Sequence, residues 1–137
     1  MATIRKEIFV RASPDAVWSA VRDVGEVHRR LCPGMLVDCR LEGEARIVTF
    51  ANGLVARELI VDVDDDARRF CWAAVGGRLT HHNASMQVFL DGSDGSRLVW
   101  IADLLPDEME PAIRALMEMG SAALKKTLES ADARASA

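Results

Sequence analysis

The sequence predicts one α+β domain, in which a curved antiparallel sheet of about six or seven strands packs on a long C-terminal helix, with two short helices after the first strand. Alternating apolar and polar residues, divided by turn signals, fill the stretch from Leu36 to Leu105. A helix-start signal follows the first strand, and the last segment changes to helical periodicity. The length of 137 residues fits a single domain covering 1–137.

Composition and charge exclude several classes of protein. Hydrophobic residues make up 50% of the chain and charged residues 28%, which is typical of a globular protein and not of a disordered one. The net charge of -4 argues against a nucleic-acid partner. No apolar run is long enough to span a bilayer, and the start, MATIRKEIFV, lacks the features of a signal peptide. We therefore expect a cytoplasmic protein with no nucleic-acid partner and no membrane insertion.

The N-terminal segments predict a strand and two short helices. Residues 2–10 alternate loosely between apolar and polar side chains and predict the strand. Ser13 fits an N-cap, Pro14 the first helical position and Gly25 the C-cap of the helix that follows. A second short helix is expected at residues 26–31, because the next proline restricts the chain before it.

About six further strands are predicted between Leu36 and Leu105, because turn-forming residues divide this stretch. The turn signals are Gly43, Asn52-Gly53, Asp64-Asp65-Asp66, Gly76-Gly77 and Asp91 to Gly95. The long helix then starts between Asp107 and Pro111. Its inner stripe, at helical spacing, consists of Ile113, Leu116, Met117, Gly120, Leu124 and Leu128.

Cysteine and histidine spacing predicts neither a disulfide framework nor a metal site. Cys32, Cys39 and Cys71 have no C-x-x-C spacing and are expected to be buried, reduced thiols. His81 and His82 are adjacent in a predicted strand, where neighbouring side chains point to opposite faces, so they cannot share one ion. We expect no metal and no cofactor.

The order of these elements resembles the START-like helix-grip (SRPBCC) superfamily, and within it the polyketide cyclase/dehydrase and lipid-transport group. The resemblance covers nearly the whole chain, and the residues that carry it are Ser13 to Trp18, Asp23, Pro33-Gly34, Glu58, Asp64-Asp65-Asp66, Arg69, Val75-Gly76-Gly77, Val99 to Pro106, Gly120, Leu124-Lys125 and Leu128-Glu129. It implies a helix gripped by a curved sheet, with an internal cavity between them. The fold hosts binders, transporters, enzymes and co-chaperones, so it does not specify a function.

Two loops are similar to those of the plant hormone-receptor branch of this superfamily. Asn52-Gly53-Leu54 resembles its gate loop and Gly76-Gly77-Arg78-Leu79 its latch. Val55 stands where the gate has a proline, and the latch lacks the histidine before Arg78. The likeness implies that both loops flank the cavity mouth, and it does not imply hormone binding.

Strand alternation and the resemblance together predict which residues contact a ligand in this cavity. They are Leu54, Glu58, Trp72, Leu79, His82, Ala84, Met86, Trp100, Ile113, Met117 and Gly120. Gly120 fits either room for a ligand or a close approach in helix–sheet packing. His82 is expected to point inward and His81 outward, and His82 fits a ligand contact, a general base or a core histidine bonded to a neighbour.

Two arguments place Glu58 on opposite faces of its strand. Alternation places Glu58 outward and Arg57 inward, beside an inward apolar set of Val55, Leu59, Val61 and Val63. The resemblance places Glu58 inward, where the receptor branch has a polar cavity group, and we follow the resemblance. An inward Glu58 near His82 would form an acid–base pair.

Three functions follow as hypotheses. The leading one is binding of a small apolar or aromatic ligand in an internal cavity between the sheet and the C-terminal helix. The second is a cyclase/dehydratase-type enzyme for a polyketide-like substrate, with His82 and Glu58 as catalytic candidates. The third is a co-chaperone-like interaction module with an exposed apolar patch. The expected partner is a small hydrophobic or aromatic molecule, and a homodimer is compatible with the apolar outer residues Val99, Ile101 and Phe89.

Overall fold

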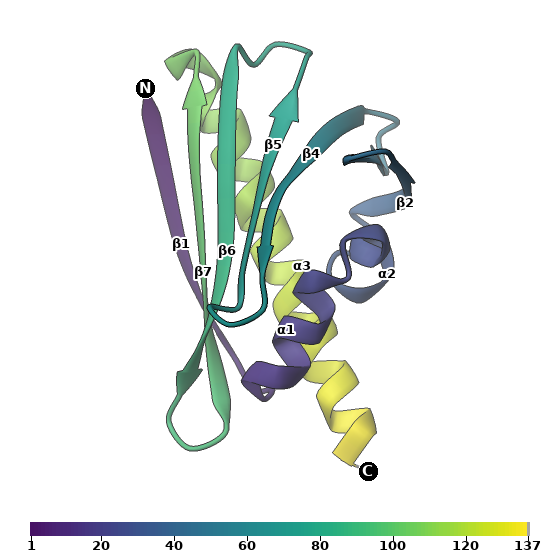
Figure 1. Ribbon diagram of the computed structural model, residues 1–137, viewed down its shortest axis with the longest axis vertical. Coiled ribbons are helices and arrows are strands. Elements are labelled where there is room, and N and C mark those ends of the chain that lie inside the picture. The colour runs from purple at the N-terminus through teal and green to yellow at the C-terminus, as the bar shows by residue number, and fades with distance from the viewer. Residues whose placement is uncertain (137) are drawn as a thin grey trace.

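Seven strands form one antiparallel sheet, and a long helix lies along its inner face (Figure 1). The structure is a computed structural model that describes residues 1–136. Its elements are β1 (Ala2–Val10), α1 (Pro14–Arg22), η1 (Val24–Glu26), α2 (Val27–Arg30), β2 (Leu36–Glu42), β3 (Ala45–Phe50), β4 (Val55–Asp64), β5 (Arg69–Val75), β6 (His81–Asp91), β7 (Gly95–Leu105), η2 (Asp107–Met109) and α3 (Glu110–Ser136). The predicted α+β class, strand number and helix order are confirmed.

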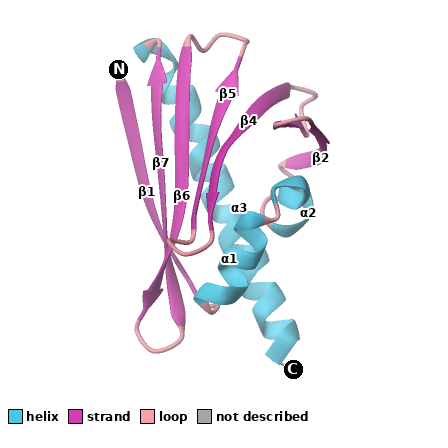
Figure 2. Ribbon diagram, viewed as in Figure 1, coloured by secondary structure: helices cyan, strands magenta, loops and turns pink. Residues whose placement is uncertain are grey.

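The strand order is β1-β7-β6-β5-β4-β3-β2, so successive strands from β2 to β7 are neighbours and β1 adds to the far edge of β7. Figures 1 and 2 show α3 running along one face of this sheet, with α1 and α2 beside it where β4 bends toward β2. The fully buried side chains of the core gather on this face, among them Ile4, Val48, Leu98, Leu104, Met117 and Leu124. Within residues 1–136 none of the helices is long and apolar enough to cross a membrane.

The first helix begins as predicted but ends earlier. Ser13 caps it, because its Oγ accepts a hydrogen bond from the Ala16 N–H at 3.2 Å. The helix ends at Arg22, and the prediction of Gly25 as its C-cap is wrong. Gly25 lies instead in the 3-10 turn η1, where a Cβ atom would be 3.3 Å from the Leu41 side chain. Close packing against β2 therefore accounts for this glycine.

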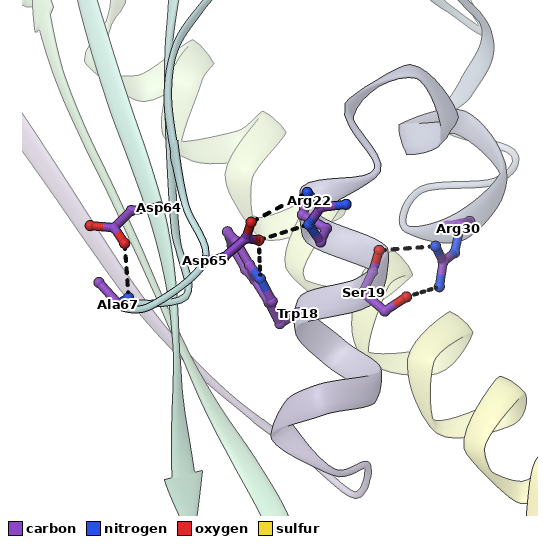
Figure 3. A network of polar contacts seen from close by, with 7 residues as sticks. All are labelled: Trp18, Ser19, Arg22, Arg30, Asp64, Asp65 and Ala67. Carbon is purple, nitrogen blue, oxygen red and sulfur yellow. Dashed lines mark hydrogen bonds and ion pairs between the residues drawn. The ribbon is translucent and has the colours of Figure 1, made fainter.

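Polar contacts fasten α1 to the turn between β4 and β5 (Figure 3). Asp65 Oδ1 accepts hydrogen bonds from Trp18 Nε1 at 2.9 Å and from Arg22 Nε at 2.8 Å. The Arg22 guanidinium and the Trp18 N–H hold the pKa of Asp65 below its usual value. Arg30 joins α2 to α1 by donating to the carbonyl and the hydroxyl of Ser19, at 2.9 and 3.0 Å. These contacts hold the two short helices against the curved part of the sheet.

The orientation that alternation predicts for β4 is right for Val63 but wrong for Glu58, Leu59 and Val61, because a β-bulge divides the strand. The pairing of β4 with β5 shifts by one residue between Ile60 and Asp62. Glu58 before the bulge and Val63 after it both lie toward the inner side. Unbroken alternation would place these two residues on opposite faces. It therefore fails for Leu59 and Val61, which are exposed, whereas Val55 is exposed at the end of the strand where it borders the cavity.

Candidate functional site

A cavity of about 480 Å³ lies between the inner face of the sheet and α3. Its wall is apolar except for a few side chains, Cys32, Arg46, Glu58, Arg78 and His82. The exposed residues Leu54, Val55, Gly76, Gly77 and Arg78 form one end of the wall. The β3–β4 and β5–β6 loops therefore flank the opening, which is where the likeness to a gate and a latch places them.

Most of the residues predicted to contact a ligand lie in this wall, namely Leu54, Glu58, Trp72, Leu79, His82, Met86, Trp100, Ile113 and Met117. Ala84 and Gly120 are not among the wall residues, which corrects their placement. Ala84 is 1% exposed, and its short side chain lies between its cross-strand neighbours Trp72 and Ala102. Gly120 is covered by the Trp100 indole, since a Cβ atom there would lie 3.0 Å from Trp100 Cη2. Close packing, and not room for a ligand, explains Gly120.

A buried ion pair is the main polar feature of the wall. Arg46 and Glu58 lie directly opposite each other on β3 and β4, and Arg46 Nε donates to Glu58 Oε1 at 2.8 Å. Arg46 Nη1 also donates to the Val24 carbonyl at 3.1 Å. The Arg46 side chain is 5% exposed and that of Glu58 is 16% exposed. Glu58 therefore faces inward, as the resemblance implied, and its carboxylate is paired with Arg46.

Aromatic rings pack around this guanidinium. Arg46 Cζ lies 5.1 Å from the centre of the Phe70 ring and 5.8 Å from that of Trp72, within the range of a cation–π interaction. The rings of Phe70 and Trp72 stack with their centres 5.0 Å apart, and Trp100 lies 6.2 Å from Trp72. The rings give the cavity flat apolar surfaces beside a fixed charge pair, an arrangement suited to an aromatic ligand with a polar end.

His82 is held by a backbone hydrogen bond at the end of a strand pair. The ladder between β5 and β6 ends where Trp72 pairs with Ala84. Two residues further along each strand, the Ala74 N–H donates to His82 Nδ1 at 3.0 Å, where a backbone carbonyl would continue the ladder. Because Nδ1 accepts this bond, the proton of the neutral ring is on Nε2. His82 can therefore donate to a ligand from Nε2, whereas its basic nitrogen is already bonded.

The ionisation of His82 makes protein stability depend on pH. Burial lowers the pKa of His82, and the negative charge of Glu58 offsets only part of this. As the pH falls through about 6.5, the unfolded chain binds a proton at His82, whereas the folded protein binds one only at a lower pH. We therefore expect the free energy of unfolding to decrease between about pH 7 and pH 5.5, and His82→Gln to reduce that slope. Urea unfolding at a series of pH values measures this dependence. If His82→Gln leaves the slope unchanged, another titrating group causes the loss of stability.

The acid–base pair predicted for Glu58 and His82 is not a direct contact. Within residues 1–136 no hydrogen bond or ion pair joins them, since Glu58 pairs with Arg46 and His82 with Ala74. Ala74 is also the cross-strand partner of Glu58, so β5 separates the two residues. Their Cα atoms are thus about 10 Å apart, twice the spacing of neighbouring strands.

Among the wall residues that the sequence analysis missed, Arg46 carries the most chemistry. The available signal was chemical, because an inward carboxylate needs a buried cationic partner. The turn at Asn52-Gly53 returns residues 45–50 alongside the strand that carries Glu58, and Arg46 is the basic residue of that segment.

Comparisons with known proteins identify the fold. The model of the family described as "Polyketide cyclase / dehydrase and lipid transport" matches residues 1–129. The solved structure of XoxI from Bacillus cereus is 20% identical over 100% of this chain and 99% of that chain, with a TM-score of 0.84. Norcoclaurine synthase from Thalictrum flavum is 20% identical over 94% of this chain and 84% of that chain, with a TM-score of 0.73.

A third solved structure is the di-domain ARO/CYC protein BexL from the BE-7585A biosynthetic pathway. It is 16% identical over 94% of this chain and 47% of that chain, with a TM-score of 0.81. No curated protein matches the chain. At these identities the structural likenesses establish the helix-grip fold, as predicted, and nothing finer.

Proposed function

The chain belongs to the polyketide cyclase/dehydrase and lipid-transport family, and on that premise we propose that it binds a small apolar or aromatic ligand between its sheet and α3. The observation that carries the proposal is the apolar cavity of about 480 Å³. This volume lies within the range of small-molecule sites, which are mostly apolar and have a few well-placed polar groups. In this proposal residues 1–137 act as one ligand-binding domain.

The polar groups of the cavity support binding better than proton transfer. Glu58 already accepts a hydrogen bond from Arg46, and the basic nitrogen of His82 already accepts one from Ala74. A general base needs a free lone pair within reach of the proton that it removes. Using His82 as a base would first break its hydrogen bond to Ala74, and Glu58 has only Oε2 free, on a carboxylate that Arg46 already holds. The same groups can orient a polar end of a ligand without any rearrangement.

The inward-facing apolar wall also distinguishes the proposal from an interaction module. A co-chaperone-like protein would present its apolar surface on the outside, where a partner chain could cover it. Here the stacked rings of Phe70 and Trp72, both nearly fully buried, face the cavity. That arrangement suits a ligand small enough to enter.

Two alanines of α3 provide a matched test of where the ligand binds. Both alanines are exposed, but Ala112 borders the cavity, whereas Ala115, three residues later, lies outside the wall. We expect Ala112→Trp to weaken binding of the neutral aromatic probe N-phenyl-1-naphthylamine by about tenfold or more, because the indole takes up space that the probe needs. Ala115→Trp should leave the affinity unchanged. A fluorescence titration measures both, and the proposal fails if wild-type protein does not bind the probe or if the two variants behave alike.

A further inference from the structure

We infer that the ligand presents an uncharged group with both a hydrogen-bond donor and an acceptor, such as a carboxamide, to the Arg46–Glu58 pair. The inference rests on the proposed function and defines the ligand's polar end. It starts from two side-chain atoms of the ion pair that make no hydrogen bond, Arg46 Nη2 and Glu58 Oε2. Arg46 uses Nε for Glu58 and Nη1 for the Val24 carbonyl, and Glu58 uses Oε1 for Arg46.

The atoms without a bond include a donor, Arg46 Nη2, and an acceptor, Glu58 Oε2, on two side chains that are joined at 2.8 Å. Among the described residues, Arg46 Nη2 and Glu58 Oε2 make no hydrogen bond. Neither is a fully enclosed atom without a partner, so both are accessible from the cavity that their side chains line. Both side chains line the cavity and are mostly buried, so a ligand that displaces water from them must satisfy them. A group that can both donate to Oε2 and accept from Nη2 meets this requirement. A group with one function alone leaves one buried polar atom unpaired.

The charges around these atoms disfavour an ionised ligand group. The positive charge of Arg46 is balanced by Glu58 at 2.8 Å, so a ligand carboxylate would gain little from the first and be repelled by the second. A ligand ammonium would gain little from Glu58, whose charge Arg46 balances, and would be repelled by Arg46. Burial raises the pKa of Cys32 to about 11, so this wall thiol stays neutral and adds no charge. Arg78 is exposed at the opening, where water screens its charge.

His82 adds a second donor to the same wall. Its Nδ1 accepts from Ala74, so Nε2 carries the proton of the neutral ring. The register places Glu58 on β4, Ala74 on β5 and His82 on β6 in one row across the sheet. A ligand that spans this row could donate to Glu58 Oε2 and accept from Arg46 Nη2 and His82 Nε2. An uncharged ligand group can make all of these hydrogen bonds.

Three isosteric naphthalene probes test the inference. 2-Naphthamide has a donor and an acceptor, 2-acetylnaphthalene has an acceptor only, and 2-naphthoate is an anion of the same shape. With wild-type protein at pH 7 we expect 2-naphthamide to bind about tenfold more tightly than the ketone, because the ketone leaves Glu58 Oε2 unpaired. 2-Naphthoate should bind most weakly. Quenching of tryptophan fluorescence follows all three titrations, because Trp72 and Trp100 line the cavity.

Glu58→Gln supplies the decisive comparison. The change keeps the shape and an oxygen acceptor for Arg46 but removes the negative charge, so the guanidinium is no longer balanced. We expect 2-naphthoate to become the tightest of the three ligands for this variant. Circular dichroism checks that the variant is folded, and the rank order of the wild-type protein tests the inference without any variant.

The outcomes separate this inference from the proposed function. If wild-type protein binds the three probes equally, or binds 2-naphthoate most tightly, the inference is wrong and the proposed function stands. It is also wrong if N-phenyl-1-naphthylamine binds and none of the three does. If none of the four aromatic compounds binds, the proposed function fails and the inference fails with it.

Discussion

Replacing Arg46 with methionine is expected to lower the free energy of unfolding by about 3 kcal/mol, the low end of the cost of removing one partner from a buried ion pair. Methionine fills much of the space of the arginine stem but leaves the Glu58 carboxylate, 16% exposed, without its cationic partner. The low end applies because the neighbouring cavity can admit water to the carboxylate. Urea unfolding at pH 7, followed by tryptophan fluorescence, measures the loss.

An exposed ion pair on β4 provides the control. Arg57 Nη1 bonds to Glu42 at 2.9 Å, but both side chains are nearly half exposed. Arg57→Met should therefore change the free energy of unfolding by less than about 1 kcal/mol. Replacing both members of the buried pair, with Arg46→Met and Glu58→Leu, should recover most of the stability, because no uncompensated charge remains. Equal losses for the two methionine variants would show that Arg46 stabilises the fold through packing and not through its charge.

The overall fold was predictable because its signals are local. The N-cap at Ser13 and the turn residues between the strands each act over a few positions, and each agrees with the structure. The long helix was recognisable from one stripe at helical spacing, of which Met117, Leu124 and Leu128 are buried. Where local signals and tertiary packing agree, single-sequence reasoning gives the architecture.

The position of Arg46 was not predictable from alternation, because both faces of β3 are buried. Ala45 and Ile47 on one face are 0% and 9% exposed, and Arg46 and Val48 on the other are 5% and 1% exposed. A strand covered on both faces has no polar side to mark its orientation. The identity of the residue facing the cavity then depends on the strand register.

That register depends on the geometry of one loop. Asn-Gly commonly forms a two-residue hairpin loop, and such a loop at Asn52-Gly53 would pair Arg46 with Leu59. The observed loop is longer, and its ends are joined by a hydrogen bond from the Phe50 N–H to the Leu54 carbonyl at 2.8 Å. It pairs Arg46 with Glu58 instead. A shift of one residue turns a strand's side chains to the opposite face, so the ion pair exists only in the observed register.

Valine in place of Gly120 is expected to lower the free energy of unfolding by about 2 kcal/mol and to weaken binding of N-phenyl-1-naphthylamine. At this glycine of α3 a Cβ atom would lie 3.0 Å from Trp100 Cη2 and 3.1 Å from Cζ3, so the indole must move. Trp100 lines the cavity, and the open side available to it is the space that the ligand would fill. Gly120→Ala should have a smaller effect, because the better helix propensity of alanine, about 1 kcal/mol, offsets part of the strain.

The cause of these losses can be tested by shortening the indole. Trp100→Phe removes the outer ring atoms that Gly120→Val would strike, so the valine should cost much less in that background than in the wild type. Urea unfolding of the two single variants and the double variant gives the coupling between the positions. Purely additive losses would mean that the strain arises elsewhere along α3. A loss in the double variant well below the sum of the two single losses would show that the valine strikes the Trp100 indole, so that a residue outside the wall controls the position of a residue that lines it.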